Sequence, residues 1–570
     1  MSSALNNSNQ AYTQLLQGSQ TVPDDVVVQQ AEKLFFEEST VSLGRFLGVL
    51  YFFKQEYLLA YVLLKEQSDP VSRFYWLYSL VRLGYSANAR VLYTQYGGAH
   101  LFEQREIADK QKIRLAFLLG LENAFHFQAE PTDVVTKTLL GLLKDFKTYA
   151  NDPSVSATLF RTGDQLLLNE LDRRKQPAPP KPAHAISEHY FDDGFLKLHS
   201  NSTVIGNNMY LLKIQNTAVI IDCGADTEND TIDFDKFFRE AGLSKNEICA
   251  VFFTHAHLDH IGNSHKLLRY LGPHVPCYLT KDTQKLASFG NQIRLDGPQL
   301  RFVSYNQTEK LSEDVDVSFV QNGHILGSVA LIFRSKGKKI LFTSDFCLHR
   351  QHTVEKMNLE QVISFVGNKI DYLIMESTYG KKRDSVGYED NVLLLQKLVA
   401  LLKKYNKKVF MPAYAIGRTQ EIINILDFQN YPDENLPRFS LTVLGSAYDV
   451  TLYYRQLQKC TMERLYAARE NAPYCDATVA SSGMLLEGSE SYNFMGNLLD
   501  NSVKDFAFIQ TGYMPPNRKG SELITQWKKN HNLFFEVGLS AHASHAELWQ
   551  LIDSFEVGQI ITIHGDGLAE

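Results

Sequence analysis

The chain has 570 residues, of which 44% are hydrophobic and 21% are charged, as in an ordinary globular protein. A chain of this length has room for about two to four domains that each bury their own core. The formal net charge is −7, which excludes an overall basic surface but not a local basic groove.

The sequence contains no signal for export or for a membrane. Its six cysteines are scattered without a C-x-x-C pair, which is typical of free thiols in a reducing compartment. Residues 1–22 are polar and lack the apolar run of a signal peptide. The most apolar stretch, residues 41–53, includes Arg45 and is too short to span a bilayer. We therefore expect no contact with a membrane and a cytoplasmic location, or a nuclear one in a eukaryote.

Residues 23–175 have the pattern of an all-α domain. Apolar residues recur there at spacings of three and four, and capping residues such as Asp69 before Pro70 mark the breaks. Core packing explains the many Tyr and Phe residues of these segments. The expected linker, residues 176–184, begins with the sequence QPAPPKP, which predicts a stiff extended segment.

After the linker, short apolar runs alternate with helical segments. The runs expected to form strands are residues 209–214 and 218–222, as a hairpin, and residues 248–254, 340–344, 372–376, 408–411, 441–444 and 559–564. Helices are expected at residues 392–405 and 419–428. Alternating strands and helices indicate an α/β architecture in which helices pack on sheets.

Side chains that can bind metals follow several of these runs. The run at residues 248–254 leads directly into the sequence HAHLDH at residues 255–260, and His324 lies in the sequence GHILG. Acidic or histidine residues also end four other runs, at Asp222, Asp345, Glu376 and His564. Because α/β sheets place ligand sites at the carboxyl ends of their strands, we expect these side chains to meet.

The spacing of the HAHLDH sequence suits two metal ions. Alternate residues leaving a strand point the same way, so His255 and His257 can bind one ion, and Asp259 and His260 can bind a second. Imidazole nitrogens and carboxylate oxygens are suitable ligands for Zn²⁺. Two such ions can share an aspartate and a water and lower the pKa of that water towards about 7, so that a hydroxide nucleophile exists at neutral pH. Distant residues must complete both shells, and the candidates are His324, Asp345 and His564.

These motifs are similar to those of the metallo-β-lactamase family, over residues of about 190–570. They resemble its β-CASP branch of nucleic-acid nucleases, which includes ribonuclease J and the nuclease subunit of the machinery that forms mRNA 3′ ends. The sequences GHILG, ESTYG and GRTQE are most similar to the cleavage-factor type. Seven motifs follow one another in order, at Asp222, residues 255–260, His324, Asp345, Glu376, His542 and His564.

The resemblance implies a fold and its boundaries. We expect a metallo-β-lactamase αββα sandwich with an inserted α/β β-CASP domain, preceded by the all-α domain. The sandwich would comprise residues 185–380 and 511–570, and a compact β-CASP domain would comprise residues 381–510.

The helical domain matches no part of this family. We expect it to bind a protein partner or to form a homo-oligomer. The alternative is direct contact with RNA through its basic residues, such as Arg105, Lys110, Lys112 and Arg114, although a solvated helix face explains these residues equally well.

The resemblance also implies the metal ligands. The expected cofactors are two Zn²⁺ ions, with Mn²⁺ or Mg²⁺ also possible. The ligands of the first ion would be His255, His257 and His324, and those of the second Asp259, His260 and His564, with Asp345 bridging the two.

Four residues are implied in catalysis and a fifth in substrate binding. Asp259 would act as a ligand, and Asp222 would orient the ligand turn and nearby water, since outer carboxylates fix imidazole tautomers. His542 resembles a general acid that protonates the leaving oxygen, and Glu376 would hydrogen-bond His542, orient it and raise its pKa. Ser544 resembles a hydroxyl that contacts a substrate phosphate.

RNA is the expected substrate, because the RNA enzymes of this branch carry histidine at the position of His564 where the DNA-repair enzymes carry valine. The sequence therefore predicts a metal-dependent ribonuclease that uses a hydroxide activated by two zinc ions, as an endonuclease, a 5′–3′ exonuclease or both. The alternatives are a DNA nuclease of the same family, a small-molecule metallo-hydrolase such as a thioesterase or lactonase, and an inactive scaffold. The long insertion before His542 argues against the small-molecule enzyme, and the filled ligand positions argue against the scaffold.

Overall fold

The structure is a computed structural model that describes most of the chain. The described residues are 12–17, 22–96, 98–121, 133–150, 152–175, 190–191, 194–198, 207–225, 232–382, 386–427, 439–460, 465–467, 475–514, 518–565 and 567–568. The linker expected at residues 176–184 and most of the tail expected at residues 1–22 lie outside them. Among the helices in these ranges, none combines the length and the apolar character needed to cross a membrane.

The region before the linker is helical throughout its described residues, as the sequence predicts. Its helices are α2 (Asp25–Glu38), α3 (Val41–Phe53), α4 (Tyr57–Lys65), α5 (Pro70–Arg82), α6 (Ser86–Gln95), α7 (Ala99–Phe102), α8 (Asp109–Leu118), α9 (Val134–Lys144), α10 (Phe146–Tyr149), α11 (Pro153–Phe160) and α12 (Gln165–Lys175). Aspartates begin several of them: Asp24 accepts a hydrogen bond from Val26 N at 2.8 Å, and Asp69 accepts one from Ser72 N at 3.0 Å. We call residues 25–175 the helical region.

The first sheet of the following part has seven strands in the order β1-β2-β3-β4-β5-β6-β7. The strands are β1 (Tyr190–Phe191), β2 (Gly194–Leu198), β3 (Tyr210–Ile214), β4 (Thr217–Ile221), β5 (Ile248–Phe252), β6 (Cys277–Leu279) and β7 (Leu300–Phe302). They are antiparallel from β1 to β4 and parallel from β4 to β7. β3 and β4 form the expected hairpin, in which Ile214 pairs with Thr217.

The second sheet has six strands in the order β19-β12-β11-β10-β9-β8. They are β8 (Thr308–Lys310), β9 (Val315–Gln321), β10 (Val329–Ser335), β11 (Lys338–Phe342), β12 (Lys369–Ser377) and β19 (Glu556–Gly565). β11, β12 and β19 are parallel to one another. The two sheets share one apolar core, in which Leu212 and Phe252 of the first sheet meet Phe319, Phe333 and Phe342 of the second.

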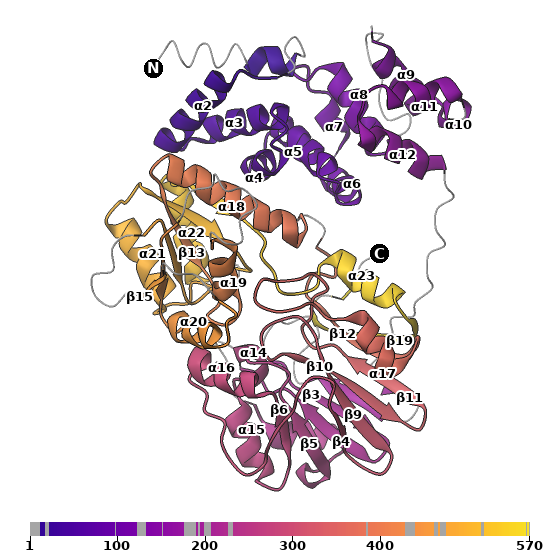
Figure 1. Ribbon diagram of the computed structural model, residues 1–570, viewed down its shortest axis with the longest axis vertical. Helices are drawn as coiled ribbons and strands as arrows, with labels where there is room; N and C mark the ends of the chain where they lie inside the picture. Colours follow the sequence, from indigo (N-terminus) through magenta and orange to yellow (C-terminus); the bar gives the residue numbers. More distant parts are fainter. Residues whose placement is uncertain are drawn as a thin grey trace.

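Helices cover the outer faces of this pair of sheets (Figure 1). The helices beside the first sheet are α13 (Phe234–Glu240), α14 (Leu258–Ile261), α15 (Ser264–Leu271) and α16 (Lys281–Asn291), and those on the second are α17 (Leu359–Val366) and α23 (His545–Asp553). Val362 of α17 and Leu551 of α23 share a core with Leu341 and Leu373 of the second sheet. The architecture is therefore the expected αββα sandwich.

A further α/β unit is inserted between β12 and α23. Its six strands, all parallel, have the order β15-β14-β16-β13-β17-β18. They are β13 (Lys408–Pro412), β14 (Leu441–Leu444), β15 (Leu465–Ala467), β16 (Ala477–Ala480), β17 (Phe506–Gln510) and β18 (Phe534–Glu536). The helices of the unit are α18 (Tyr388–Lys404), α19 (Arg418–Ile425), α20 (Ala447–Gln456), α21 (Glu490–Asp500) and α22 (Lys519–Lys529). Because α22 and β18 belong to this inserted unit, residues 386–536, it continues beyond residue 510, the expected boundary.

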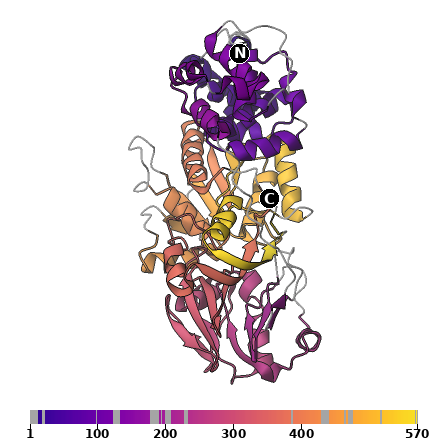
Figure 2. The same ribbon diagram turned by 90° about the vertical axis from the view of Figure 1, so that its right-hand side faces the viewer.

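The helical region packs directly on the inserted unit (Figures 1 and 2). The ring of Phe36 stacks on that of Tyr405, with centroids 4.9 Å apart. The carboxylate of Glu32, whose residue is 6% exposed, accepts hydrogen bonds from Tyr51 Oη at 2.8 Å, Tyr405 Oη at 2.6 Å and Lys404 Nζ at 2.8 Å. This face of the helical region is therefore covered by the chain itself.

We expect Glu32→Ala to destabilise the junction between the helical region and the inserted unit. The change leaves the buried hydroxyl of Tyr51 without its acceptor, at a cost of about 1–3 kcal/mol, and removes the acceptor of the partly buried Tyr405 hydroxyl. Calorimetry should show unfolding at a lower temperature. Glu37→Ala is the control, because the Glu37 side chain is 49% exposed and lies 3.9 Å from Lys33. Equal unfolding temperatures for the two variants would contradict this account of the junction.

Candidate metal and catalytic centre

The sandwich brings five chain segments together at the carboxyl ends of parallel strands. Asp222 follows β4, His255 follows β5 and Asp345 follows β11, while Glu376 and His564 lie near the ends of β12 and β19. All five residues are between 0% and 2% exposed. Because buried ionisable groups require a partner or a metal, their convergence marks this edge as a candidate site.

One group of potential ligand atoms is formed by His255, His257, His324 and Asp345. One nitrogen or oxygen atom of each lies within 4.8 Å of the others. His257 Nδ1 and His324 Nε2 are 2.9 Å apart, and His255 Nε2 lies 3.6 Å from Asp345 Oδ2. We call these four residues the first ligand group.

The opposite nitrogens of two of these imidazoles face carbonyl oxygens. His324 Nδ1 lies 3.0 Å from the oxygen of Ala541, and His257 Nε2 lies 3.3 Å from that of Ile416. A carbonyl oxygen only accepts, so these nitrogens carry the hydrogen, and the lone pairs of His324 Nε2 and His257 Nδ1 face each other. Burial also lowers the pKa of His257 to about 4, which favours the neutral form that binds metals.

Asp259, His260 and His564 form the second ligand group, whose potential ligand atoms also lie within 4.8 Å of one another. His564 Nε2 is 3.2 Å and His260 Nε2 is 3.6 Å from Asp259 Oδ2. The buried Asp222 accepts from His260 Nδ1 at 2.8 Å through its Oδ2 and so leaves Nε2 to face the group. This contact orients the imidazole in the way that outer carboxylates orient metal ligands.

Asp345, a member of the first ligand group, also faces the second. Its Oδ2 is 3.2 Å from His260 Nε2 and 3.7 Å from His324 Nε2, and its Oδ1 is 3.6 Å from His564 Nδ1. Burial alone would raise the pKa of Asp345, but the imidazoles of His564 and His260 hold this pKa well below its usual range. An ionised carboxylate that faces both groups is consistent with a binuclear metal site.

Two buried atoms of the first ligand group indicate that a cation fits there. His255 Nε2 and Asp345 Oδ1 are buried and have no hydrogen-bond partner among the described residues. Leaving a buried polar group unsatisfied costs about 1–3 kcal/mol. A cation would satisfy both atoms, because imidazole nitrogen and carboxylate oxygen are common metal ligands. The residues present therefore fit a metal centre.

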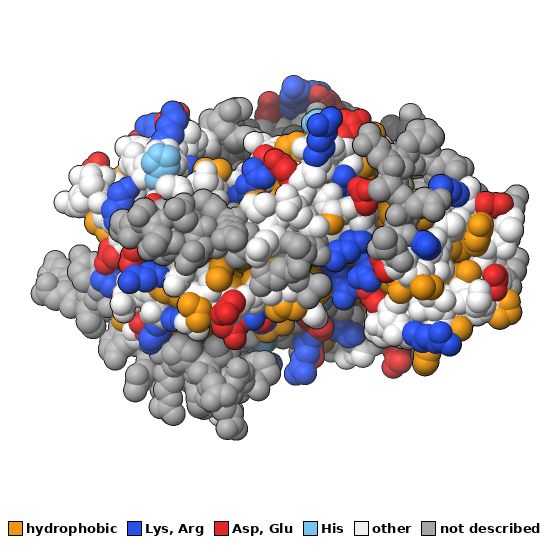
Figure 3. Space-filling view, turned by 90° about the horizontal axis from the view of Figure 1, so that it is seen from above, with side chains coloured by type: hydrophobic (Ala, Val, Ile, Leu, Met, Phe, Trp, Pro, Cys, Tyr) orange, Lys and Arg blue, Asp and Glu red, His pale blue; other side chains and the backbone are white. Residues whose placement is uncertain are grey.

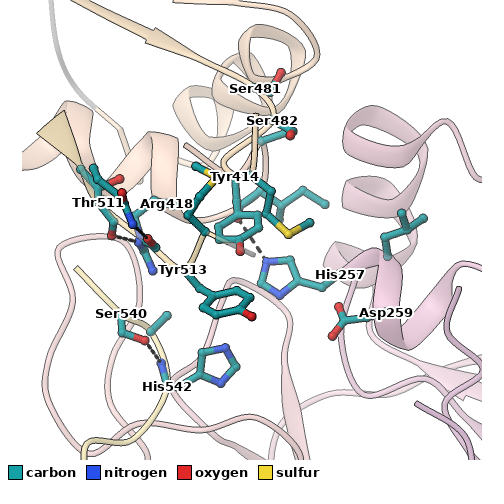
Figure 4. Close-up of a pocket in the computed structure, with 18 of the residues that line it drawn as sticks. His257, Asp259, Tyr414, Arg418, Ser481, Ser482, Thr511, Tyr513, Ser540 and His542 are labelled. Carbon is teal, nitrogen blue, oxygen red and sulfur yellow. Dashed lines mark hydrogen bonds between the residues drawn. The ribbon is translucent and has the colours of Figure 1, made fainter. Parts of the chain in front are cut away.

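His542 and Glu376 form a hydrogen-bonded pair beside these groups. His542 Nδ1 lies 2.8 Å from Glu376 Oε2. Glu376 is held in turn by Phe346 N at 2.7 Å and by Thr378 Oγ1 at 2.6 Å. Although burial opposes a positive charge, the Glu376 carboxylate raises the pKa of His542 to about 10. The Glu376 carboxylate thus favours the protonated form of His542, which faces the cavity in Figure 4.

Ser544 has a structural role. Its Oγ accepts from Glu547 N at 3.3 Å, and Glu547 Oε2 accepts from Ser544 N at 2.8 Å, which forms a capping box at the start of α23. Ser544 is not among the described residues that line the cavity. The expected contact with a substrate phosphate has no counterpart in this arrangement and stays a prediction.

Asn208 is a site residue that no motif in the sequence indicates. Its Nδ2 lies 3.1 Å from His260 Nε2 and 3.2 Å from Asp259 Oδ2, within the second ligand group. It belongs to the segment just before β3, far from any of the motifs. A lone asparagine before a strand has too many other roles to be selected from a single sequence.

Two threonines could have been found from their places in the motifs. Thr254, which immediately precedes HAHLDH, donates to Asp222 from its N at 2.7 Å and from its Oγ1 at 2.8 Å. Thr378, in the ESTYG sequence, has its Oγ1 2.9 Å from His564 Nδ1 and donates to Glu376. Both hydroxyls hold site residues in place.

A cavity of about 1370 Å³ opens over the two ligand groups. His257, Asp259 and His542 line it from the sandwich side. Residues of the inserted unit line it from the opposite side, among them Tyr414, Arg418, Ser481, Ser482, Thr511 and Tyr513 (Figure 4). The guanidinium of Arg418 donates to the carbonyl oxygen of Thr511, which fixes this cation in the wall.

Comparisons with known proteins give similarities over the part of the chain that carries the centre. Residues 202–354 match the family described as the Metallo-beta-lactamase superfamily. Transcription termination factor FttA of Methanocaldococcus jannaschii is 24% identical over 424 residues, which are 64% of this chain and 65% of that protein. Ribonuclease TTHA0252 of Thermus thermophilus is 24% identical over 412 residues, 64% of this chain and 91% of that protein.

An RNase J-like protein of Methanocaldococcus jannaschii is 28% identical over 242 residues, which are 41% of this chain and 54% of that protein. The chain thus spans 65% of the FttA protein and about half of the RNase J-like protein. Residues 202–354 are thus similar to the metallo-β-lactamase superfamily, and the distant relatives of the chain include proteins named as ribonucleases.

Proposed function

We propose that the chain is a metal-dependent ribonuclease that hydrolyses phosphodiester bonds beside the two ligand groups. The observation that carries the proposal is the position of Asp345 between two clusters of buried imidazoles, next to the His542–Glu376 pair. The relatives named as ribonucleases support RNA as the substrate.

Seven side chains would hold two divalent cations. Their donors are imidazole nitrogens and carboxylate oxygens, a set that suits Zn²⁺. When bound, the cations would supply positive charge for the attacked phosphate and would lower the pKa of a water molecule. The ligands of one cation would be His255, His257 and His324, and those of the other Asp259, His260 and His564, with Asp345 facing both.

His542 would donate a proton to the oxygen that leaves when the phosphodiester bond breaks. Its Nδ1 is bound to Glu376, so Nε2 is the atom free to face the substrate. The negative charge of Glu376 keeps the imidazole protonated at neutral pH, because it raises the pKa of His542 to about 10. Positioned general acids typically contribute about 10²–10⁴-fold to the rate.

The cavity favours a polymer over a small molecule as the substrate. Its volume of about 1370 Å³ exceeds the roughly 300–1,000 Å³ that is typical of small-ligand pockets. Aromatic rings and basic groups line it together, as in sites that bind single strands, for example Tyr414, Tyr513 and Arg418. The small substrates of a thioesterase or lactonase would fill only part of this cavity.

Metal content should depend on Asp345. We expect the purified chain to bind up to two Zn²⁺ ions, and Asp345→Ala to lose most of both, because its carboxylate faces both ligand groups. Elemental analysis after gel filtration measures the content. Asp314→Ala is the control, since its side chain is 52% exposed and lies 3.5 Å from Lys336. Full zinc content in Asp345→Ala would exclude the proposed ligand set.

Replacement of His542 should slow cleavage without emptying the metal centre. We expect His542→Ala to reduce kcat on RNA about 10²–10⁴-fold while the zinc content stays at the wild-type level. A phosphodiester with a p-nitrophenolate leaving group needs no protonation, so its hydrolysis should fall much less. His274→Ala, an exposed histidine outside the cavity, is the control. Equal losses on both substrates would rule out a general acid.

Cleavage of matched RNA and DNA tests the substrate class. We expect a single-stranded RNA to be cleaved in the presence of Zn²⁺ and not after treatment with EDTA, and single-stranded DNA of the same sequence to be cleaved more slowly. Oligonucleotides labelled at the 5′ or the 3′ end separate internal cleavage from stepwise removal of nucleotides. Preferential cleavage of DNA would support the DNA nuclease instead, and cleavage of neither would refute a nuclease.

A further inference from the structure

We propose that the helical region forms one wall of the substrate path, where Lys65 binds the phosphate backbone of single-stranded RNA. The inference rests on the proposed function, because it extends the path of the same RNA away from the ligand groups. It assigns to the helical region a role within its own chain, whereas the sequence predicts a partner or a homo-oligomer, with RNA contact through other basic residues as the alternative.

The end of α4 reaches the cavity that opens over the ligand groups. Tyr61 and Lys65, both from α4, belong to the residues that line it. Tyr61 is 2% exposed and stacks on Trp76, with ring centroids 6.3 Å apart, which anchors this part of the wall in the core of the helical region. Lys65 is the last residue of α4, and its Nζ lies 2.9 Å from Glu536 Oε2 on β18. Helical region and inserted unit therefore meet at the cavity wall.

The lining beyond the ligand groups is predominantly basic. Its basic residues are Lys65, Lys381, Lys382, Arg418 and Arg518, and its acidic residues are Glu490 and Glu536. Burial would raise the pKa of Glu536, but the positive charge of Lys65 lowers it, and the charges of Lys528 and Lys382 lower it further. Lys528 is itself paired with Glu66 at 2.9 Å, so the positive charge at this wall comes from the excess of basic over acidic residues in the lining. Such a charge beside exposed aromatic rings suits the backbone of a single strand.

The opposite side of the helical region is less suited to RNA. Viewed from the helical end, basic and acidic side chains are interspersed on the described surface (Figure 3). None of the described basic residues considered from the sequence, Arg105, Lys110, Lys112 and Arg114, belongs to the lining of the cavity. The alternative of RNA contact through that helix face is therefore disfavoured relative to the cavity wall.

The wall is held in place by contacts outside the cavity. Lys397 of α18 pairs with Glu56, which precedes α4, at 2.6 Å. Tyr85 Oη donates to Asp390 Oδ2 at 2.7 Å. Because these contacts join the same two parts without lining the cavity, they provide a control for a purely structural role of Lys65.

Binding of a 12-nucleotide oligouridylate to the full-length chain tests the inference. Fluorescence anisotropy in EDTA keeps the RNA intact during the measurement. We expect Lys65→Met to raise Kd about three- to tenfold and to reduce the slope of log K against log salt by about 0.7, the share of one phosphate contact. Lys65→Arg should stay within about twofold of the wild type, because it keeps the charge. Lys397→Met, which breaks an ion pair between the same two parts, should also bind as the wild type does.

Unchanged RNA binding and salt dependence in Lys65→Met would overturn the inference. An equal loss of binding in Lys397→Met would overturn it as well, because Lys65 would then only join the helical region to the inserted unit. No measurable binding by the wild type would overturn it too. Cleavage by the zinc-loaded wild type is measured separately, so the two proposals fail in different ways. RNA that binds through Lys65 but is never cleaved contradicts the ribonuclease and not the path.

Discussion

The carboxylate of Asp345 is buried among imidazoles at the meeting point of the two ligand groups. An ionised carboxylate loses its hydration on burial and persists only where opposite charge or hydrogen bonds replace the lost water. Here the replacement within the chain is incomplete, because Asp345 Oδ1 and His255 Nε2 have no partner among the described residues. Burial lowers the pKa of His257 and so favours the neutral imidazole, whose Nδ1 has a lone pair and no proton where it faces His324. Cations would turn these opposed lone pairs into ligands, and the proposed chemistry depends on that exchange.

The surrounding fold sets the direction of each ligand. Asp222 fixes His260 from within the sandwich, whereas the carbonyl oxygens that fix His324 and His257 belong to Ala541 and Ile416, beside and within the inserted unit. The position of that unit therefore affects how His257 of the first ligand group is oriented. A buried carboxylate strengthens the junction: Glu421 of α19 accepts from the backbone of His352 at 2.7 Å and of Thr353 at 3.0 Å, in the loop after Asp345. The helical region packs on α18 and contributes Tyr61 and Lys65 to the wall of the cavity.

Local patterns in the sequence were sufficient for strands such as β4, β5 and β12 and for the convergence of the motif residues. Short strands such as β6 to β8 were not expected, and the sandwich was expected only from the family resemblance. The HAHLDH sequence follows a buried strand, and that placement alone predicts where its side chains gather. The contacts that the sequence did not predict are all long-range: Asn208 reaches the second ligand group from another segment, and Lys65 meets Glu536 across 471 positions. The boundary expected at residue 510 misses β18, because a three-residue strand is too short for a periodic pattern to reveal. Ser544 illustrates a different difficulty: a hydroxyl within a motif can cap a helix, so its place in the motif does not by itself indicate contact with a substrate.

The most direct test of the account is the anomalous scattering of zinc in crystals of the full chain. We expect two peaks about 3.5–4 Å apart, one beside each ligand group, with the Asp345 carboxylate in contact with both. A single ion, or two ions that do not both contact Asp345, would contradict the account.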